Sequence, residues 1–239
     1  MRASAGGLGN MGSVVKRQRA WVRIFVDVAM AVLFIVVMAT ALVQEAPHEY
    51  VGIALFVAVV AHIVLNRRWF KALFRGRYNA VRVLQLVAVV GLLACIIGQV
   101  VSSLVLSKYA FGFLPAFPGA SWARRAHMLC SYWSFVFAFA HAGLQFKGFS
   151  RLVKPKGSGS PSAAVLLGRI AVIVVACYGA YAFVQVNMGA YLLGQIEFAF
   201  ADFAIPPALM CARYAAIAVL VAAAFYCLCR VIEALGKRN

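Results

Sequence analysis

The chain has 239 residues, of which 65% are hydrophobic and 12% are charged, and its mean hydropathy is +0.91. This composition excludes an ordinary soluble domain and indicates a membrane protein. The net charge of +17 comes from 23 basic and 6 acidic residues. The basic residues gather between apolar segments, so we attribute the charge to membrane topology and expect no nucleic-acid binding.

Six apolar segments are each long enough to cross the hydrocarbon core of a bilayer, which takes about 20 helical residues. Each is expected to be a helix, because a backbone exposed to lipid must satisfy its own hydrogen bonds. The predicted helices cover residues 21–43, 50–68, 83–106, 126–145, 165–187 and 208–230. We therefore expect an all-α membrane protein with six transmembrane helices, in which 21–146 form a four-helix bundle of two similar hairpins and 165–239 form a C-terminal hairpin.

The basic residues alternate with the predicted spans. They occur before the first span, in the second and fourth connections and after the last span, as Arg2, Lys16, Arg17, Arg19, Arg23, Arg67, Arg68, Lys71, Arg75, Arg77, Arg82, Lys147, Arg151, Lys154, Lys156, Arg230, Lys237 and Arg238. This positive-inside bias predicts a multi-pass protein of the cell (inner) membrane with both termini in the cytoplasm. Residues 1–20 are then a basic cytoplasmic N-terminus, and 147–164, rich in Gly, Ser and Pro, a cytoplasmic linker.

The four histidines of the chain form two pairs with the same spacing of 14 residues. His48 and His62 lie in the second predicted helix, and His127 and His141 lie in the fourth. Fourteen residues turn a helix by about 1400°, close to four whole turns, and rise about 21 Å. Both histidines of a pair therefore point the same way, and the two helices run in the same direction. We expect His48 with His127 at the outer level and His62 with His141 at the inner level.

Two imidazoles at each level suit a haem iron, which takes two axial ligands, in the core of a helical bundle. Zinc needs more than two protein ligands, and a proton path would want acids between the levels. Histidines packed by hydrogen bonds remain an alternative, although ionisable groups at membrane depth usually have a function. Without a C-x-x-C-H motif, we predict two non-covalent b haems, whose iron ligands are these four histidines.

Small residues on the histidine faces are expected to leave room for the macrocycles: Gly52 on the second helix, and Ser131 and Ser134 on the fourth. Gly91 and Gly98 on the third helix either serve the same purpose or simply pack.

Charged residues near the bundle ends suggest further roles. Arg124 and Arg125 either pair with haem propionates or anchor the helix at the interface. Asp27 is expected to form a structural ion pair with Arg23, one turn away. Near the outer end of the last hairpin, Arg213 is expected to pair with Glu197 or Asp202.

Two outer segments are also candidates for binding. Residues 191–207 are too amphipathic to span and are expected to lie in the outer interface, for lateral packing or as a partner surface. The aromatic stretch 109–117 either admits a quinone, docks a partner or anchors the interface.

The first hairpin resembles a known family. Asp27 followed by HEYVG at 48–52 and HIVLNRRWF at 62–70 is similar to the flavinylation-associated cytochrome family, over at least residues 20–70, and the second hairpin repeats the pattern more loosely. The resemblance implies a di-haem membrane cytochrome that works with extracytoplasmic flavin-carrying proteins. The sequence has no flavin-attachment domain of its own, so a flavoprotein is expected as a partner.

The leading hypothesis is an electron-transfer cytochrome that carries electrons across the membrane between a quinol pool or cytoplasmic-side donor and an extracytoplasmic redox partner. Direct use of NAD(P)H is not expected, since no G-x-G-x-x-G fingerprint occurs. Three alternatives stay open: a stand-alone quinone reductase or superoxide oxidase, a haem subunit of a larger dehydrogenase or hydrogenase complex, and a non-redox transporter or assembly factor. Whether the chain is an enzyme by itself also stays open, and we assign it no catalytic residue.

Overall fold

The computed structural model describes residues 5–39, 45–73, 78–115, 118–146, 163–198 and 205–236. Over these residues the chain forms eight helices and no strand, which confirms the all-α class. The helices are α1 (Ala5–Met38), α2 (Glu45–Leu65), α3 (Arg67–Leu73), α4 (Ala80–Leu106), α5 (Ala120–Gln145), α7 (Ala163–Gln185), α8 (Met188–Leu192) and α9 (Pro207–Leu235). Most of the predicted linker, together with Arg75, Arg77, Phe117 and Asp202, lies outside the described residues.

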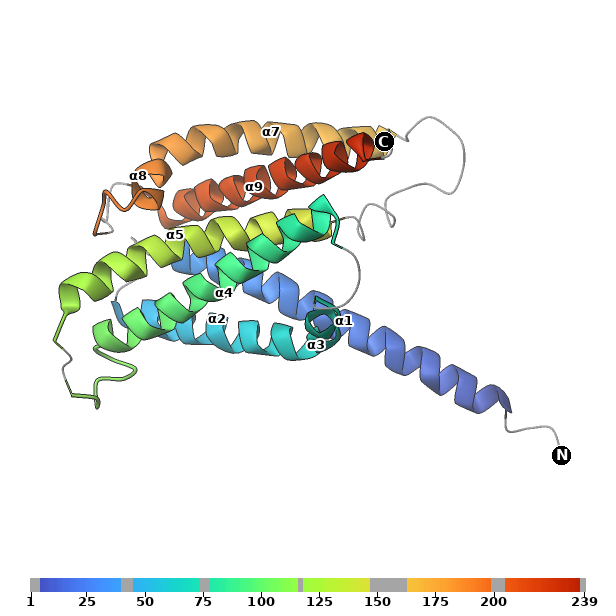
Figure 1. The fold of residues 1–239 in the computed structure, drawn as a ribbon, viewed down its shortest axis with the longest axis horizontal. Coiled ribbons are helices and arrows are strands. Elements are labelled where there is room, and N and C mark those ends of the chain that lie inside the picture. Colours follow the sequence, from blue (N-terminus) through green and yellow to red (C-terminus); the bar gives the residue numbers. More distant parts are fainter. Residues whose placement is uncertain are drawn as a thin grey trace.

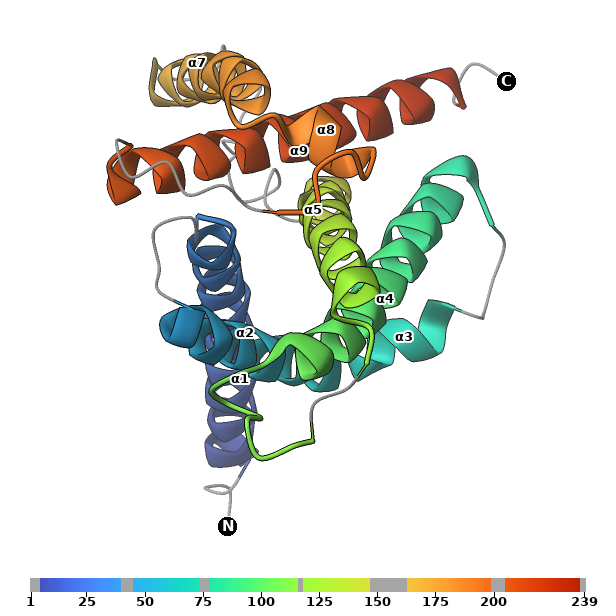
Figure 2. The ribbon, with the colours of Figure 1, turned by 90° about the vertical axis from the view of Figure 1, so that its left-hand side faces the viewer.

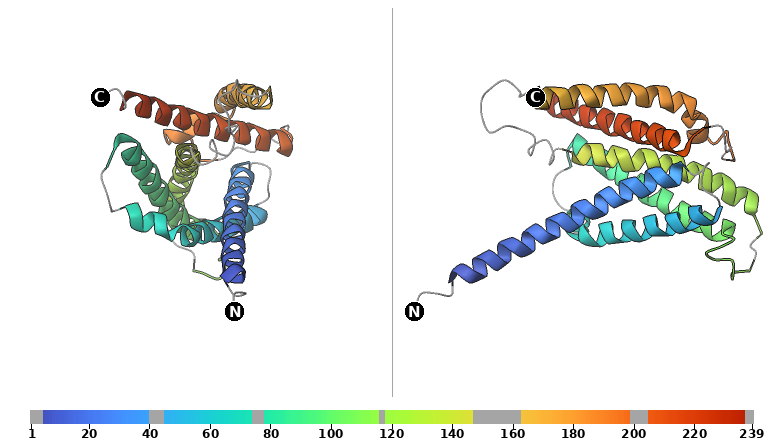
Figure 3. Two further views of the ribbon diagram at one scale, coloured as in Figure 1. Left: turned by 90° about the vertical axis from the view of Figure 1, so that its right-hand side faces the viewer. Right: turned by 180° about the vertical axis from the view of Figure 1, so that it is seen from behind.

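Each of the six predicted segments overlaps one long helix, but the helices start earlier than hydropathy suggests. The largest difference is in α1, whose helix includes most of the basic N-terminal segment and projects beyond the other helices (Figures 1 and 3). α2 begins at Glu45 and α5 at Ala120. Hydropathy marks only the part of a helix that suits hydrocarbon, whereas backbone hydrogen bonding continues into the polar ends.

Five of the six long helices are long and apolar enough to cross a membrane, which confirms the membrane-protein class. They are α1 from Ala20, α2, α4, α7 and α9. α5 has 26 residues but is less apolar than the other five, because it contains two histidines, two arginines and several serines.

The six long helices run alternately in opposite directions (Figure 1). α2 and α5 start at the same end of the molecule and therefore run in the same direction, as the alternation of the six predicted segments required. α1 packs on α2, α4 packs on α5, and α7 packs on α9. Figure 2 shows α9 lying across α5 and α1, with α7 on the far side of α9.

Small residues let the helices around α5 approach closely. A side chain at Gly143 would collide with the backbone carbonyl of Ala222 in α9. On α4, a Cβ added at Gly91 would lie 2.7 Å from the Phe137 ring, and one at Gly98 would lie 2.6 Å from Cys130 Sγ. Both of these glycines face side chains of α5, so of their two expected roles the structure supports packing.

An aromatic cluster joins α5 to the C-terminal hairpin. Tyr132 of α5 stacks on Tyr191 of α8 with ring centroids 4.2 Å apart, and its hydroxyl lies 3.1 Å from that of Tyr214 in α9. Phe135 and Met188 are fully buried beside them. The start of the segment expected at the outer interface is thus packed inside the protein, and α5 serves both halves of the molecule.

Candidate di-histidine site

The outer histidines meet as the spacing predicts. The ring centroids of His48 in α2 and His127 in α5 are 6.0 Å apart, and the ring planes are inclined by 63°. The two rings come from parallel helices that belong to different hairpins, and those hairpins have few close backbone contacts with one another. At this level the imidazoles are therefore a main point of contact between α2 and α5.

Polar side chains of α4 surround the ring of His127. The amide Nε2 of Gln99, which can only donate, lies 3.3 Å from His127 Nε2 and donates to Ser131 Oγ at 2.7 Å. The hydroxyls of Ser102 and Ser103 lie 3.4 Å from His127 Nδ1. These contacts suit a neutral His127 that carries its proton on Nδ1 and accepts from Gln99 at Nε2.

The inner histidines are arranged differently. His62 Nδ1 lies 2.7 Å from Asp27 Oδ1 in α1. The ring of His141 packs edge-to-face on Trp69 of α3 at 5.9 Å between centroids. The expected ion pair between Asp27 and Arg23 is wrong. Asp27 bonds to His62 instead, and Arg23 donates from Nη2 to the carbonyl oxygen of Leu65 at 3.0 Å.

One ring at each level has a buried nitrogen without a hydrogen-bond partner. These atoms are Nδ1 of His48 and Nδ1 of His141. A buried polar atom that is left unsatisfied costs about 1–3 kcal/mol, so native proteins usually supply a partner, a water or an ion. The first of these rings, His48, lies beside His127, and the second, His141, packs on Trp69.

The separation of the outer rings fits a shared metal. Two metal–imidazole bonds of about 2 Å each, together with the two ring radii, add up to nearly the 6.0 Å between the centroids of His48 and His127. Among the described residues, no three His, Cys, Asp or Glu side chains gather to hold a bare metal ion. Each level offers two imidazoles, the number that an iron porphyrin leaves to the protein.

The small residues expected to line the site have different surroundings. A Cβ added at Gly52 would meet no atom within 4 Å. Ser131 donates to the carbonyl of His127 at 2.7 Å and accepts from Gln99, and Ser134 is buried and donates to the carbonyl of Ser131. Gly52 thus borders open space one turn after His48. The hydroxyls of both serines instead form hydrogen bonds within α5, and that of Ser131 also accepts from Gln99 of α4.

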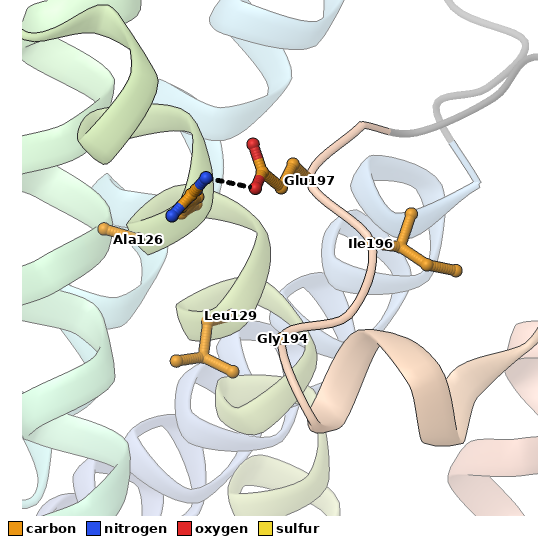
Figure 4. A pocket seen from close by; sticks show the side chains of 6 residues that line it. Ala126, Leu129, Gly194, Ile196 and Glu197 are labelled. Carbon is orange, nitrogen blue, oxygen red and sulfur yellow. Dashed lines mark ion pairs between the residues drawn. The ribbon is translucent and has the colours of Figure 1, made fainter.

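The two arginines before His127 face the segment that follows α8. Arg125 forms an ion pair of 2.6 Å with Glu197, and this pair borders a small pocket whose walls include Leu129 and Ile196 (Figure 4). Arg124 lies over the ring of Phe198 at 4.6 Å. Glu197 therefore pairs with Arg125 rather than with Arg213, and pairing of either cation with propionates stays a prediction.

The outer end of α2 is held by carboxylates. Glu49 accepts hydrogen bonds from the hydroxyl of Ser107 at 2.6 Å and from the backbone N–H groups of residues 108–110 at 2.8 to 3.1 Å. Lys108 lies beyond the end of α4, and its hydrogen bond to Glu45, together with the charge of that carboxylate, raises the pKa of its ammonium group. These contacts fix His48, next to Glu49, against the α4–α5 hairpin.

Sequence reasoning missed several polar partners of the histidines. Gln99, Ser102 and Ser103 lie on α4, and their spacing places them on one face of a helix otherwise rich in Val, Leu and Ile. Polar side chains on one face of a span were a usable signal. The packing of Trp69 on His141 was harder to predict, because it depends on the direction in which the chain turns from α2 into α3.

Comparison of the chain with protein-family models, with curated proteins and with solved structures finds no match. The functional argument therefore depends on the geometry of the site.

Proposed function

We propose that the protein is a di-haem b-type cytochrome of the membrane. His48 and His127 hold the outer haem, and His62 and His141 hold the inner haem, in both cases without covalent attachment. The observation that carries the proposal is the 6.0 Å approach of His48 and His127 from parallel helices. The same spacing of 14 residues between the histidines of both helices, a rise of about 21 Å, supports a second site at His62 and His141.

The protein contributes ligands, spacing and a medium of low polarity. Bound haem supplies a one-electron couple at its iron, which the chain itself lacks. α2 and α5 set the distance between the two levels, and the hydrogen bond of His62 Nδ1 to Asp27 leaves Nε2 of that ring as the ligand atom. The surrounding apolar helices keep water and competing reactions away from the path of the electron between the two haems.

The role that follows is transfer of electrons across the inner membrane, between a quinol pool or another cytoplasmic-side donor and an extracytoplasmic redox partner. In this proposal α5 also crosses the membrane, in addition to the five more apolar helices, and both termini are cytoplasmic. Resemblance of the first hairpin to the flavinylation-associated cytochromes supports a flavoprotein as the partner.

Haem content and its dependence on each histidine test the proposal. Purified protein should show two haems per chain as the pyridine haemochrome. His48→Ala or His127→Ala should remove the outer haem only, and His62→Ala or His141→Ala the inner haem only. Phe111→Ala, in the outer loop, is a control that should keep both. A purified chain without Soret absorption would refute the proposal, and loss of both haems from every single variant would refute the two-level assignment.

A separate assay distinguishes a conduit from an enzyme. Purified protein should be reduced and reoxidised by added donors, but should not turn over with quinone and superoxide in the absence of a partner. Sustained turnover without a partner would instead support the stand-alone quinone reductase.

A further inference from the structure

The two histidine levels differ in the groups that touch their Nδ1 atoms. At the inner level, His62 Nδ1 lies 2.7 Å from a carboxylate oxygen of Asp27 and 3.4 Å from the amide Nδ2 of Asn66. At the outer level, His127 Nδ1 faces the neutral hydroxyls of Ser102 and Ser103 at 3.4 Å. Hydrogen bonds that involve an ionised group are shorter and roughly twice as strong as neutral ones. The inner ring is therefore the more strongly polarised.

The acidic residues near the outer level do not reproduce this contact. Glu49 neighbours His48, but its oxygens accept from Ser107 and from backbone N–H groups. Glu45 pairs with Lys108. Among the described residues, the carboxylate that bonds to an imidazole is Asp27.

Neighbouring contacts hold the Asp27–His62 pair in place. Arg23, one turn before Asp27 in α1, donates to the carbonyl of Leu65 in α2 at 3.0 Å. Asn66 donates from Nδ2 to the carbonyl of His62 at 3.0 Å. The register of α1 against α2 is thus fixed at the inner end, and the carboxylate meets the ring without rearrangement.

We infer that Asp27 is a positioning residue that makes the inner haem the one of lower reduction potential. The inference rests on the proposed function. Asp27 accepts the Nδ1–H of His62, which fixes the lone pair on Nε2 and raises the basicity of that nitrogen. A more basic ligand beside a negative charge stabilises the oxidised iron, which carries one more positive charge than the reduced iron.

This difference in reduction potential between the two haems sets the favoured direction of electron transfer. An electron that passes from the inner to the outer haem moves towards the higher potential, oxidising one iron and reducing the other, with no bond or proton transferred. The difference favours electron flow from the cytoplasmic side to the outer face, so the extracytoplasmic partner is the electron acceptor.

Potentiometric titration of the full chain with both haems bound tests the inference. Asp27→Asn keeps the size of the side chain and removes its charge. We expect it to raise the lower midpoint by about 59 mV, the equivalent of a tenfold change in a one-electron equilibrium, and to leave the upper midpoint unchanged. Asp27→Glu should restore the lower value, and Glu49→Gln, the matched control at the outer level, should not move the lower midpoint.

Variants with one haem assign the midpoints independently. His127→Ala, which keeps the inner haem, should titrate at the lower midpoint, and His62→Ala should titrate at the upper one. The reverse assignment would overturn the inference even if Asp27→Asn loses its inner haem, as would two midpoints in Asp27→Asn that equal those of the wild type. Either result leaves the proposed function intact, whereas a wild-type chain without haem would remove the proposed function itself.

Discussion

At the scale of single residues, Glu45 and Glu49 lie one helical turn apart but make different contacts. Glu49 accepts four hydrogen bonds from residues 107–110, whereas Glu45 makes one exposed ion pair with Lys108. Glu49→Gln should lower the free energy of unfolding by about 2 kcal/mol, because hydrogen bonds to a charged group are worth about 1.5–3 kcal/mol.

Glu45→Gln is the control for that change. An exposed ion pair contributes roughly 0–1 kcal/mol, so this variant should unfold close to the wild type. Thermal unfolding of both variants in detergent measures the difference. Equal midpoints would show that Glu49 does not hold the loop after α4.

The histidine pairing was accessible from the sequence, but the partners of the histidines were not. The spacing, together with the predicted common direction of the two helices, placed His48 opposite His127, since a helix has a fixed pitch. The same reasoning paired Asp27 with Arg23, which lies one turn away on the same helix, and missed His62. A contact between helices depends on how α1 and α2 are rotated about their axes, and local sequence does not fix that rotation.

At the scale of helices, small residues set how close α5 and α9 approach. A Cβ at Gly143 would collide with the backbone of Ala222, which cannot move without shifting α9. Gly143→Val should therefore destabilise the protein by roughly 2 kcal/mol, within the usual cost of overpacking.

Gly168 provides the matched control, because it is also a helical glycine and a Cβ there meets no atom within 4 Å. Gly168→Val should leave the thermal midpoint in detergent nearly unchanged. If both variants unfold alike, the close approach of α5 and α9 is not what stabilises this interface.

The position of α5 explains why its hydropathy is the lowest of the long helices. It packs on α4, α8 and α9, so several of its faces meet protein rather than lipid. Polar side chains such as Ser134 are then satisfied inside the bundle. Hydropathy located the helix from its apolar core near 126–145, but could not show that the helix is central.

At the scale of the whole molecule, alternating helix directions relate the two ends of the chain. Ala5 begins α1 and Gly236 follows α9 at the same end of the bundle (Figure 1). Basic residues also lie at that end: Arg67 begins α3, Arg82 is in the first turn of α4, and Arg230 lies towards the end of α9. The basic residues and the helix directions thus mark the same end of the molecule, whereas hydropathy alone supports five spans.

Reporter fusions decide between five and six spans, because an odd number would place the termini on opposite sides. With α5 as a span, a reporter that is active only in the cytoplasm should be active at both termini and inactive when inserted in the loop around Gly112. A second reporter that is active only outside the cytoplasm should give the reverse pattern at all three positions. Opposite behaviour of the two termini would show that α5 does not cross the bilayer. His127 and His141 would then lie at one depth, and the two-level arrangement of the histidines would fail with it.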